Sequence, residues 1–568
     1  MPNLSTHWLR AGILGAVLAL PGGLQAQTSW QWAAVPASGS TGQSHVYAAV
    51  VEPSGNVVVA GGFSGTMTLG STALTSAGGN DVFVARLNSA GAWIQAVSAG
   101  SAYDDYALAV AVDGSGNVAV GGYYSGPSAS FGTTTLPNTN TDVNSRTNEG
   151  FVARLNNSGA WTQATRVSGA ANESVVAVAL DAAGTITAAG NFSSNTASLG
   201  SSNLTNSNNN SSNDVFVARL SNAGTWTQVV QGGGGGDDFV HALAVDGSGN
   251  ATVAGDFNNA TLSLGTLTLN NANSSQYSSD IFVARLNSAG TWTQAARAGG
   301  AGNEYSHGVA LDGSGNATVA GNFASPTITF GTTVLTNANS STEPTSDIFV
   351  ARLNSAGTWT MAARGGGSGN DYTNALAVDV NGRTSVAGSF DGVTSAFGTN
   401  ALTNADASGK TGDILVARLS STGTWDLALR AGGVGDDYTN ALALDGGGNA
   451  VLGGDLYSSP SVFGPVTLDR YGSGYVAKLM GLVTPTQAAR EAGAFTLAPN
   501  PARGVVRLHW PTSRLPEPVL LLDALGRVVG RQVLPAQSGQ ATLNLQGLTA
   551  GVYVVRVGQS AQRLLVVE

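Results

Sequence analysis

The chain has 568 residues, of which 42% are hydrophobic and only 10% are charged, and it contains 78 glycines. This length provides for one large repeat domain with a smaller one, and low charge with abundant glycine favours short strands and tight turns over helical bundles. The formal net charge of −10 argues against nucleic-acid binding, and the absence of cysteine excludes disulfides, thiolate metal sites and thiol catalysis.

The first 26 residues read as a secretory signal peptide. His7 and Arg10 precede an apolar run that ends at Leu20, and Ala26 offers a small-residue cleavage site before Gln27. The run is too short to span a bilayer comfortably, so we expect a mature chain without a transmembrane segment. The alternative is that this segment is retained as an anchor.

Residues 27–480 contain a repeated unit. Two independent sequence markers give the number of units. The first marker is a Val-Ala-Arg/Lys-Leu tetrad. Its basic residue stands at Arg86, Arg154, Arg219, Arg285, Arg352, Arg418 and Lys478. The second marker is a turn glycine, at Gly55, Gly116, Gly184, Gly249, Gly315, Gly382 and Gly448. Both markers indicate seven units.

Each unit holds four strand-like runs. In the fifth unit they are residues 307–312, 317–323, 348–353 and 359–364, and glycine-rich turns join the first pair and the last pair. Four antiparallel strands in a repeated unit are typical of a β-propeller, and an open β-solenoid is the main alternative.

The two ends of the repeat region complement each other. The seventh unit stops at Leu479 without the tryptophan-bearing fourth strand, and the chain begins with an unpartnered copy of that strand at residues 30–34. Pairing the two would remove both exposed sheet edges. We therefore predict an all-β fold, a seven-bladed β-propeller closed by an N-terminal strand.

Family resemblance supports this prediction over residues 30–480. The sequence GGVGDDYTNALALDGGGN at residues 432–449 and the DIFVARL segments resemble the SBBP (seven-bladed β-propeller) repeats of bacterial exported proteins. The resemblance implies the fold and not a chemistry. Such repeats are similar to NHL-type blades, which serve mostly as interaction platforms.

The composition changes after the repeats. We predict a linker at 481–494, followed by six or seven short strands in residues 495–568 that form a small Ig-like β-sandwich. Motifs in this segment resemble the type A C-terminal sorting domain of the type IX secretion system of Bacteroidota. The matching residues include Pro499, Asn500, Pro501, Asp523, Gly526, Gly551 and Tyr553.

The sorting-domain resemblance implies a destination and a partner. It implies handling by the type IX secretion machinery after export through the periplasm, removal of the domain, and release from the cell or attachment to surface lipopolysaccharide. The chain departs from the family in ending at Glu568, where a basic residue is common. The alternative is a small accessory binding domain.

One acidic residue precedes the first strand of six units and could form a ring at one mouth of the central channel. These residues are Asp105, Glu173, Asp238, Glu304, Asp371 and Asp437. Calcium favours such carboxylates, so a cation ring is one hypothesis. The alternative is that each carboxylate accepts hydrogen bonds from amides of its own loop. No other cofactor is indicated.

Three further sets of residues, each at one position of successive repeats, have mainly structural interpretations. An acidic residue such as Asp312 opens each first hairpin and should fix its turn. The tetrad arginine should bind carbonyl groups or the Asp at the start of its own strand, as Arg285 with Asp280. The tryptophans that begin the fourth strands, such as Trp359, should seal blade edges, although exposed ones could stack on sugars.

One position of the repeat, which we call the variable column, holds different residue types in different units. His241 and His307 share a repeat position near the predicted channel mouth, where they could bind a metal, but no third ligand is evident. The other units place Tyr47, Leu108, Val176, Asn374 and Asn440 there. The loops between second and third strands also vary, and binding specificity usually resides in such loops.

Catalytic motifs such as GxSxG, HExxH or a phosphate loop are absent from the sequence. We therefore expect a non-enzymatic, secreted or cell-surface interaction module that binds protein or glycan on the loop-rich propeller face. The alternatives are an enzyme acting on extracellular polysaccharide and a calcium-stabilised structural adhesin.

Overall fold

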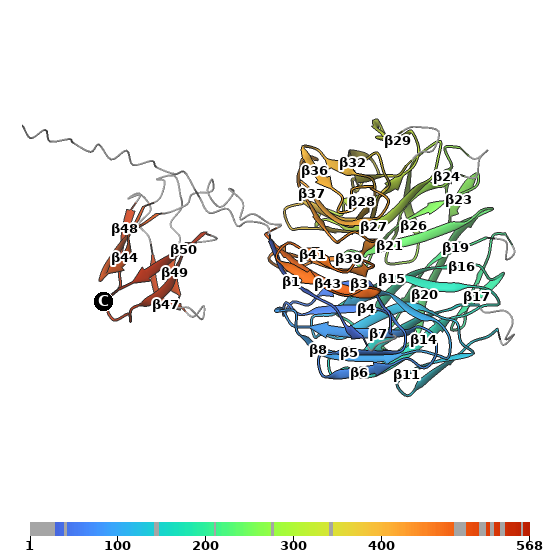
Figure 1. Cartoon of the computed structure of the whole chain (residues 1–568), viewed down its shortest axis with the longest axis horizontal. Helices are drawn as coiled ribbons and strands as arrows, with labels where there is room; N and C mark the ends of the chain where they lie inside the picture. The colour runs from blue at the N-terminus through green and yellow to red at the C-terminus, as the bar shows by residue number, and fades with distance from the viewer. Residues whose placement is uncertain are drawn as a thin grey trace, which may run out of the picture. The chain divides into compact units, whose positions relative to one another are not determined.

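The computed structural model describes residues 29–38, 42–140, 147–208, 212–273, 278–339, 345–481, 496–509, 518–522, 528–533, 540–557 and 560–567. Every regular element in these ranges is a β-strand (Figure 1). The chain divides into two compact units, Gln27–Leu482 and a second that contains Val483–Glu568. Among the described residues, no helix has the length and apolar character needed to cross a membrane. The predicted signal peptide and residues 482–495 of the linker region lie outside these ranges.

The first unit is built from sheets of four main antiparallel strands, as the repeat predicts. First strands alternate between buried and half-buried side chains. They are β3 (Ser44–Val51), β9 (Asp105–Val112), β15 (Glu173–Leu180), β21 (Asp238–Val245), β27 (Glu304–Leu311), β33 (Asp371–Val378) and β39 (Asp437–Leu444). Second strands are almost wholly buried. They are β4 (Val57–Phe63), β10 (Val118–Tyr124), β16 (Ile186–Phe192), β22 (Ala251–Phe257), β28 (Ala317–Phe323), β34 (Thr384–Phe390) and β40 (Ala450–Leu456).

Third strands carry the tetrad, and fourth strands begin at tryptophan in six sheets. The third strands are β7 (Asp81–Leu87), β13 (Glu149–Leu155), β19 (Asp214–Leu220), β25 (Asp280–Leu286), β31 (Asp347–Leu353), β37 (Asp413–Leu419) and β43 (Ser473–Met480). The fourth strands are β8 (Trp93–Ala99), β14 (Trp161–Val167), β20 (Trp226–Gly234), β26 (Trp292–Gly300), β32 (Trp359–Gly367), β38 (Trp425–Ala431) and β1 (Ser29–Ala34). In the fifth repeat the first strand begins at Glu304, three residues before the predicted start, because the acidic residue already pairs with Phe323.

Turn chemistry explains the hairpins between first and second strands. In the fifth repeat Asp312 Oδ1 accepts hydrogen bonds from the amides of Ser314 and Asn316, both at 2.9 Å. Gly315 has a φ of 75°, in the left-handed region that favours glycine. The predicted role of the turn aspartate is confirmed here.

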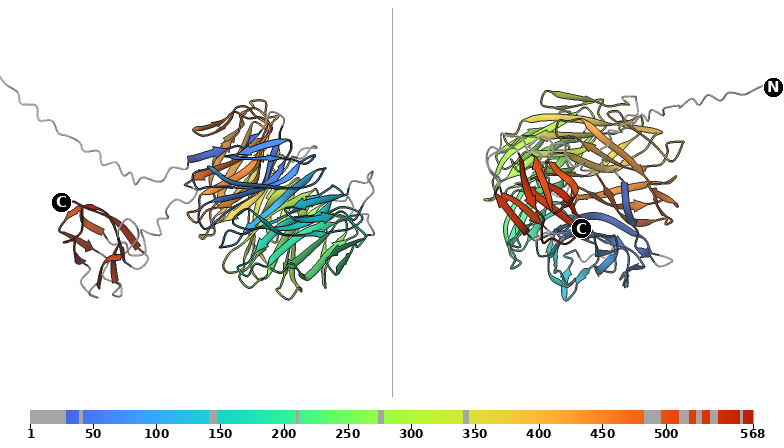
Figure 2. Two further views of the ribbon diagram at one scale, coloured as in Figure 1. Left: turned by 90° about the horizontal axis from the view of Figure 1, so that it is seen from below. Right: turned by 90° about the vertical axis from the view of Figure 1, so that its left-hand side faces the viewer.

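The N-terminal strand β1 occupies the fourth position of the last sheet, as predicted. It pairs with β43 in the order β1-β43-β40-β39 (Figure 1). Trp30 lies opposite Leu479, just as Trp93 lies opposite Leu87 and Trp425 opposite Leu419. The blue strand beside the orange strands is also visible from other directions (Figure 2).

Small two-stranded hairpins link neighbouring sheets. They are β5 (Thr66–Leu69) with β6 (Thr72–Thr75), β11 (Ser128–Phe131) with β12 (Thr134–Pro137), β17 (Thr196–Leu199) with β18 (Ser202–Thr205), β23 (Thr261–Leu264) with β24 (Leu267–Asn270), β29 (Thr327–Phe330) with β30 (Thr333–Thr336), β35 (Thr394–Phe397) with β36 (Asn400–Thr403), and β41 (Ser461–Phe463) with β42 (Val466–Leu468). The end of a fourth strand pairs with the hairpin of the next sheet, as β32 does with β35. The short β2 (Ala37–Ser38), which follows β1, pairs with β5 in the same way.

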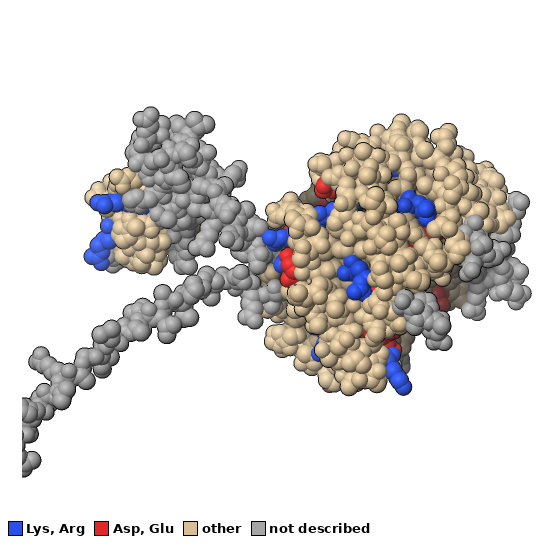
Figure 3. Space-filling model, turned by 90° about the horizontal axis from the view of Figure 1, so that it is seen from above, with Lys and Arg blue, Asp and Glu red and all other residues tan. Residues whose placement is uncertain are grey.

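The cores lie between adjacent sheets. Val451 and Val476 of the last sheet belong to the same buried cluster as Val57, Val59 and Phe83 of the first. Each first strand contacts the first strand of the next sheet, and β39 contacts β3. On the face shown in Figure 3, charged side chains form only scattered spots, in keeping with their low share of the sequence.

The second unit is a smaller antiparallel assembly with one parallel pairing. Its described strands are β44 (Thr496–Arg503), β45 (Val505–His509), β46 (Pro518–Leu522), β47 (Val528–Val533), β48 (Gln540–Asn544), β49 (Gly551–Val557) and β50 (Ser560–Val566). They follow the order β47-β46-β49-β50-β44-β45-β48. Val506, Leu508, Leu521 and Val555 lie in its core.

Candidate functional site

The six acidic residues proposed as a cation ring each begin a first strand, and all are buried. Several bind their own loops. Glu304 Oε2 accepts from the Gly300 amide at 2.9 Å, and Asp371 Oδ2 accepts from the Gly367 amide at 2.7 Å. These contacts are the ones that the structural alternative predicts.

A second set of buried acids faces the first and was not recognised as a partner from the sequence. These residues begin the third strands of the preceding sheets, at Asp81, Glu149, Asp214, Asp280, Asp347 and Asp413. A methyl group added to Gly100 would lie 2.7 Å from Asp81 Oδ1 and 2.8 Å from Asp105 Oδ2. Gly432 lies in the same way between Asp413 and Asp437. The two carboxyls of a pair therefore meet across one glycine.

Burial dominates the electrostatics of these acid pairs. It raises the pKa of Asp238 to about 9, and the neighbouring Asp214 carboxyl adds to the increase. Burial likewise raises the pKa of Glu173 and of Glu304 to about 8. At neutral pH one carboxyl of such a pair is therefore protonated in the folded protein.

Arginines neutralise the negative charge of some of the buried acid pairs but not of others. Arg297 and Arg364 form ion pairs of 2.7 Å with Asp280 and Asp347, whereas Gln231 occupies the matching place beside Asp214. In the part of the chain that the structure describes, neither oxygen of the Asp238 carboxyl has a hydrogen bond of good geometry, although the nearby Gly234 amide offsets part of the increase in its pKa. Among the described residues, no group of three or more His, Asp or Glu side chains is arranged to hold a metal ion. The calcium ring stays a prediction.

The tetrad arginines join one sheet to the next. Arg285 Nη2 donates to the carbonyl oxygens of Gly315 at 2.7 Å and Asn354 at 3.2 Å, both in the following repeat. The predicted pairing with Asp280 is wrong, because Asp280 binds Arg297 from the fourth strand. The predicted binding to carbonyl groups is confirmed.

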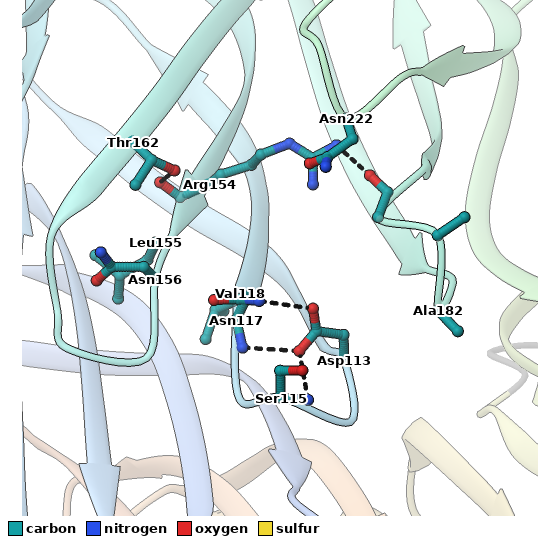
Figure 4. Close-up of a pocket in the computed structure, with 12 residues that line it drawn as sticks. Asp113, Ser115, Asn117, Val118, Arg154, Leu155, Asn156, Thr162, Ala182 and Asn222 are labelled. Atoms are coloured by element: carbon teal, nitrogen blue, oxygen red, sulfur yellow. Dashed lines mark hydrogen bonds between the residues drawn. The ribbon is translucent and has the colours of Figure 1, made fainter.

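Polar grooves open beside two of these arginines. A cavity of about 360 Å³ lies next to Arg154, where Asp113 and Asn117 come from one hairpin and Asn222 from the next sheet (Figure 4). A cavity of the same size lies next to Arg285. Because the arginines are already bound to carbonyls there, we assign these grooves to the contact between sheets.

The fourth-strand tryptophans pack between sheets. Trp161 Nε1 donates to the Ser98 carbonyl at 3.1 Å and Trp359 Nε1 to the Arg297 carbonyl at 3.2 Å, each in the preceding sheet. Trp292 and Trp425 are only 5% and 6% exposed. The packing interpretation is confirmed for these residues.

The variable column consists of the residues at which the register of the first strand shifts by one. The shift leaves an extra residue unpaired at Tyr47, Leu108, Val176, His241, His307, Asn374 and Asn440. A β-bulge re-aims one side chain and is common beside functional sites. The bulge recurs in all seven sheets with five different residue types, so the fold does not dictate the side chain at this position.

The two histidines of this column lie together. The rings of His241 and His307 are 5.6 Å apart, and His241 Nε2 lies 2.6 Å from Asp256 Oδ1. Burial, followed by the neighbouring His241, lowers the pKa of His307.

A group of six tyrosines, which we call the tyrosine cluster, lies in the last, first and second sheets. Its members are Tyr47, Tyr106, Tyr123, Tyr438, Tyr457 and Tyr471. Ring centroids are 5.8 Å apart for Tyr47 and Tyr106 and 5.5 Å apart for Tyr106 and Tyr123. They are 6.2 Å apart for Tyr438 and Tyr457 and 5.9 Å apart for Tyr457 and Tyr471.

An aspartate connects the two halves of the tyrosine cluster. Asp455 lies near the hydroxyls of both Tyr47 and Tyr457, since its charge raises the pKa of each after the larger effect of burial. The Asp455 carboxylate also accepts from Asn440 Nδ2 at 3.0 Å and lies 3.3 Å from His45 Nδ1. The sequence contained a signal for this cluster, because several of its tyrosines break the repeat.

The described sorting-domain residues make local contacts in the second unit. Pro499, Asn500 and Pro501 lie in β44, where Asn500 Oδ1 accepts from the Leu565 amide at 2.8 Å. Gly551 begins β49, and the Tyr553 hydroxyl donates to the Thr549 carbonyl at 2.9 Å. Asp523 and Gly526 lie outside the described residues.

Comparison with known families identifies this segment. Residues 496–567 match the secretion system C-terminal sorting domain. The sorting domain indicates export by type IX secretion, to the cell surface or the surroundings, and hence handling by that machinery. The predicted sorting role is supported to this extent.

The chain also matches solved structures with which it shares little sequence. The WD40 domain of Neurospora crassa Pan2 has 10% identity and a TM-score of 0.29, covering 60% of this chain and 85% of its own. Sqt1 from Chaetomium thermophilum has 9% identity and a TM-score of 0.39, covering 80% and 99%. YCF48 bound to D1 peptide has 8% identity and a TM-score of 0.37, covering 80% and 95%. A search of curated proteins returns no match.

Deletion of residues 495–568 tests the sorting role. We expect the truncated protein to be absent from the cell surface and the medium and to accumulate inside the cell, because the sorting domain has been removed. Fractionation followed by immunoblotting checks this, with the full-length chain as control. Normal surface delivery of the truncated chain would contradict the sorting role.

Proposed function

We propose that the first unit is a closed seven-bladed β-propeller built from SBBP-type repeats. Three observations support closure. β1 takes the fourth position of the last sheet, β2 pairs with the hairpin of the first sheet, and β3 contacts β39. The buried contact of Val451 and Val476 with Phe83 repeats the packing between other neighbouring sheets.

We further propose that this propeller is a non-enzymatic interaction module of a Bacteroidota-like bacterium, exported with a cleaved signal peptide and released or held at the surface by lipopolysaccharide. It binds an extracellular protein or glycan through the face that carries the loops between second and third strands. The tyrosine cluster carries this proposal, because its aromatic rings gather on that face and two of them, Tyr123 and Tyr457, are not required by the repeat.

Comparison with the rest of the propeller favours binding over catalysis. The buried acids and the arginines recur from sheet to sheet and stabilise contacts between sheets. The unequal positions, such as Tyr123 and Tyr457, supply aromatic surface and hydroxyls instead of an acid–base pair. The protein needs no cofactor in this scheme, and protons on the acid pairs take the place of calcium.

A ligand screen tests the proposal. We expect the purified full-length protein to retain a member of a panel of extracellular proteins and glycans, and Tyr457→Ser to abolish that retention. Serine is already present at the matching positions Ser64, Ser125 and Ser193, so the fold should tolerate it. Reproducible turnover of a polysaccharide, lost in one point variant, would overturn the non-enzymatic proposal.

A further inference from the structure

Two members of the tyrosine cluster, Tyr123 and Tyr457, depart from the repeat at positions where the other sheets have no aromatic ring, whereas Tyr106 and Tyr438 occupy a position that is aromatic in most repeats. Tyr123 pairs with Tyr106 at a place where the second strands otherwise have Gly62, Asn191, Asp256, Asn322, Ser389 and Asp455. Tyr457 follows its second strand where the others have Ser64, Ser125, Ser193, Asn258, Ala324 and Asp391. Folding therefore does not explain these rings, and a role in binding does.

The rings of the cluster are accessible. Tyr471 is 70% exposed, and Tyr106, Tyr438 and Tyr457 are half-buried. Their neighbours meet them mostly edge to face, with interplanar angles of 78° for Tyr47 and Tyr106 and 80° for Tyr457 and Tyr471. Such an arrangement holds the side chains in place while part of the surface stays open to a ligand.

Carboxylates surround the cluster. Asp104 raises the pKa of Tyr106, after burial, to about 12, and Asp436 does the same for Tyr438. Asp455 lies between the two halves of the cluster and near His45. The phenols therefore stay neutral at physiological pH, and aspartates supply the negative charge of the site. Of these, Asp455 is 8% exposed and pairs with His45, whose pKa this contact raises.

We propose that the tyrosine cluster binds a positively charged side chain, a lysine or an arginine on a basic segment of a partner protein. This inference rests on the proposed function and adds the ligand chemistry. A cation gains from the negative faces of aromatic rings and from nearby carboxylates together. A neutral sugar would use the rings without the charge, and an anion would be repelled.

The probes are a hexalysine peptide and a neutral hexasaccharide, measured by calorimetry with the full-length protein. We expect hexalysine to bind, and Asp455→Asn and Tyr123→Asn each to weaken that binding at least tenfold. Both substitutions introduce a residue that Asn191 and Asn322 already provide at the matching position. Melting curves check that the variants are folded.

Matched controls separate this site from general attraction to an acidic protein. Asp406→Asn removes the same charge from a loop outside the cluster. Tyr305→Ser removes a tyrosine that is equivalent to Tyr106 but lies in another sheet, and Ser174 already occupies this position in the third sheet. Both should bind hexalysine as the parent protein does. Equal weakening by Asp406→Asn and Asp455→Asn would overturn the inference.

Two further outcomes distinguish the inference from the proposed function. Binding of the hexasaccharide, lost on Tyr123→Asn, with no binding of hexalysine would overturn the cation site and leave the interaction module standing. Failure of both probes, together with unchanged retention of a screened ligand by Tyr457→Ser, would overturn both proposals.

Discussion

Trp30→Ala is expected to lower the free energy of unfolding of the first unit by about 3–5 kcal/mol, the usual cost of truncating a buried aromatic side chain. Trp30 is only 7% exposed, and its ring lies 5.1 Å from that of Phe463 in an edge-to-face contact. Trp30 lies in β1, so the substitution removes packing from the contact that joins the two ends of the repeat region. Urea unfolding followed by circular dichroism measures it.

Gln31→Ala is the matched control, because Gln31 is exposed in the same strand. It should change stability by no more than about 0.5 kcal/mol. Deletion of residues 29–38 should have a larger effect, since it leaves β43 as an unpaired edge that invites association between chains. Equal stability of the Trp30 and Gln31 variants would contradict the role given to β1.

Raising the pH from 5 to 9 is expected to destabilise the first unit through its buried acid pairs. The folded-state pKa of Asp238 is raised to about 9, and those of Glu173 and Glu304 to about 8, all by burial first. An unfolded carboxyl loses its proton near pH 4. Stability from these groups is therefore fully present below about pH 4 and is lost as the pH rises through the folded values.

The expected slope is about 1.4 kcal/mol per pH unit for each group that stays protonated in the folded state. Asp238→Asn replaces the protonated acid by a neutral side chain of the same shape. It should make the protein more stable than the parent at pH 9, with a smaller difference at pH 5. Thermal or urea unfolding across this range measures the effect.

Asp406→Asn provides the control for the pH experiment. Hydrogen bonds from Ser408 and Lys410 lower the pKa of this exposed carboxyl to about 2, far below the range tested. Its substitution should leave the slope unchanged. A parent protein whose stability is constant or rises from pH 5 to 9, or an Asp238 variant with the parent's slope, would show that the acid pairs do not carry the predicted protons.

The sequence was most informative where one residue type returns at a fixed interval. Repeated glycines and the tetrad located the strands closely, because each blade-like sheet needs the same turns and the same buried runs. The pairing of β1 was also predictable, because the seventh repeat lacks a fourth strand and the N-terminal segment has the sequence of one. In the fifth repeat the second strand matches at both ends, whereas the first strand begins three residues earlier and the fourth strand ends three residues later than predicted.

Side-chain contacts between different sheets could not be predicted from the sequence. Asp81 and Asp105 belong to different sheets, and only their placement on either side of Gly100 reveals a pair. Proximity in sequence suggested Asp280 as one of two alternative partners of Arg285, but Asp280 pairs with Arg297 and Arg285 binds carbonyl groups of the next sheet. The sequence does not predict the tyrosine cluster, because its members come from three repeats and only the fold brings them together.

The closing contact between β1 and β43 can be tested with a designed disulfide, because the chain contains no cysteine. Ser29 lies opposite Met480, and paired residues of antiparallel strands have Cα atoms about 4.5–5.5 Å apart, within the range a disulfide spans. The double variant Ser29→Cys/Met480→Cys should form a disulfide within one chain, seen by mass spectrometry and gel mobility of the monomer, whereas the single variants should not. Free thiols in the oxidised double variant, or disulfides only between chains, would contradict a propeller closed by its N-terminal strand.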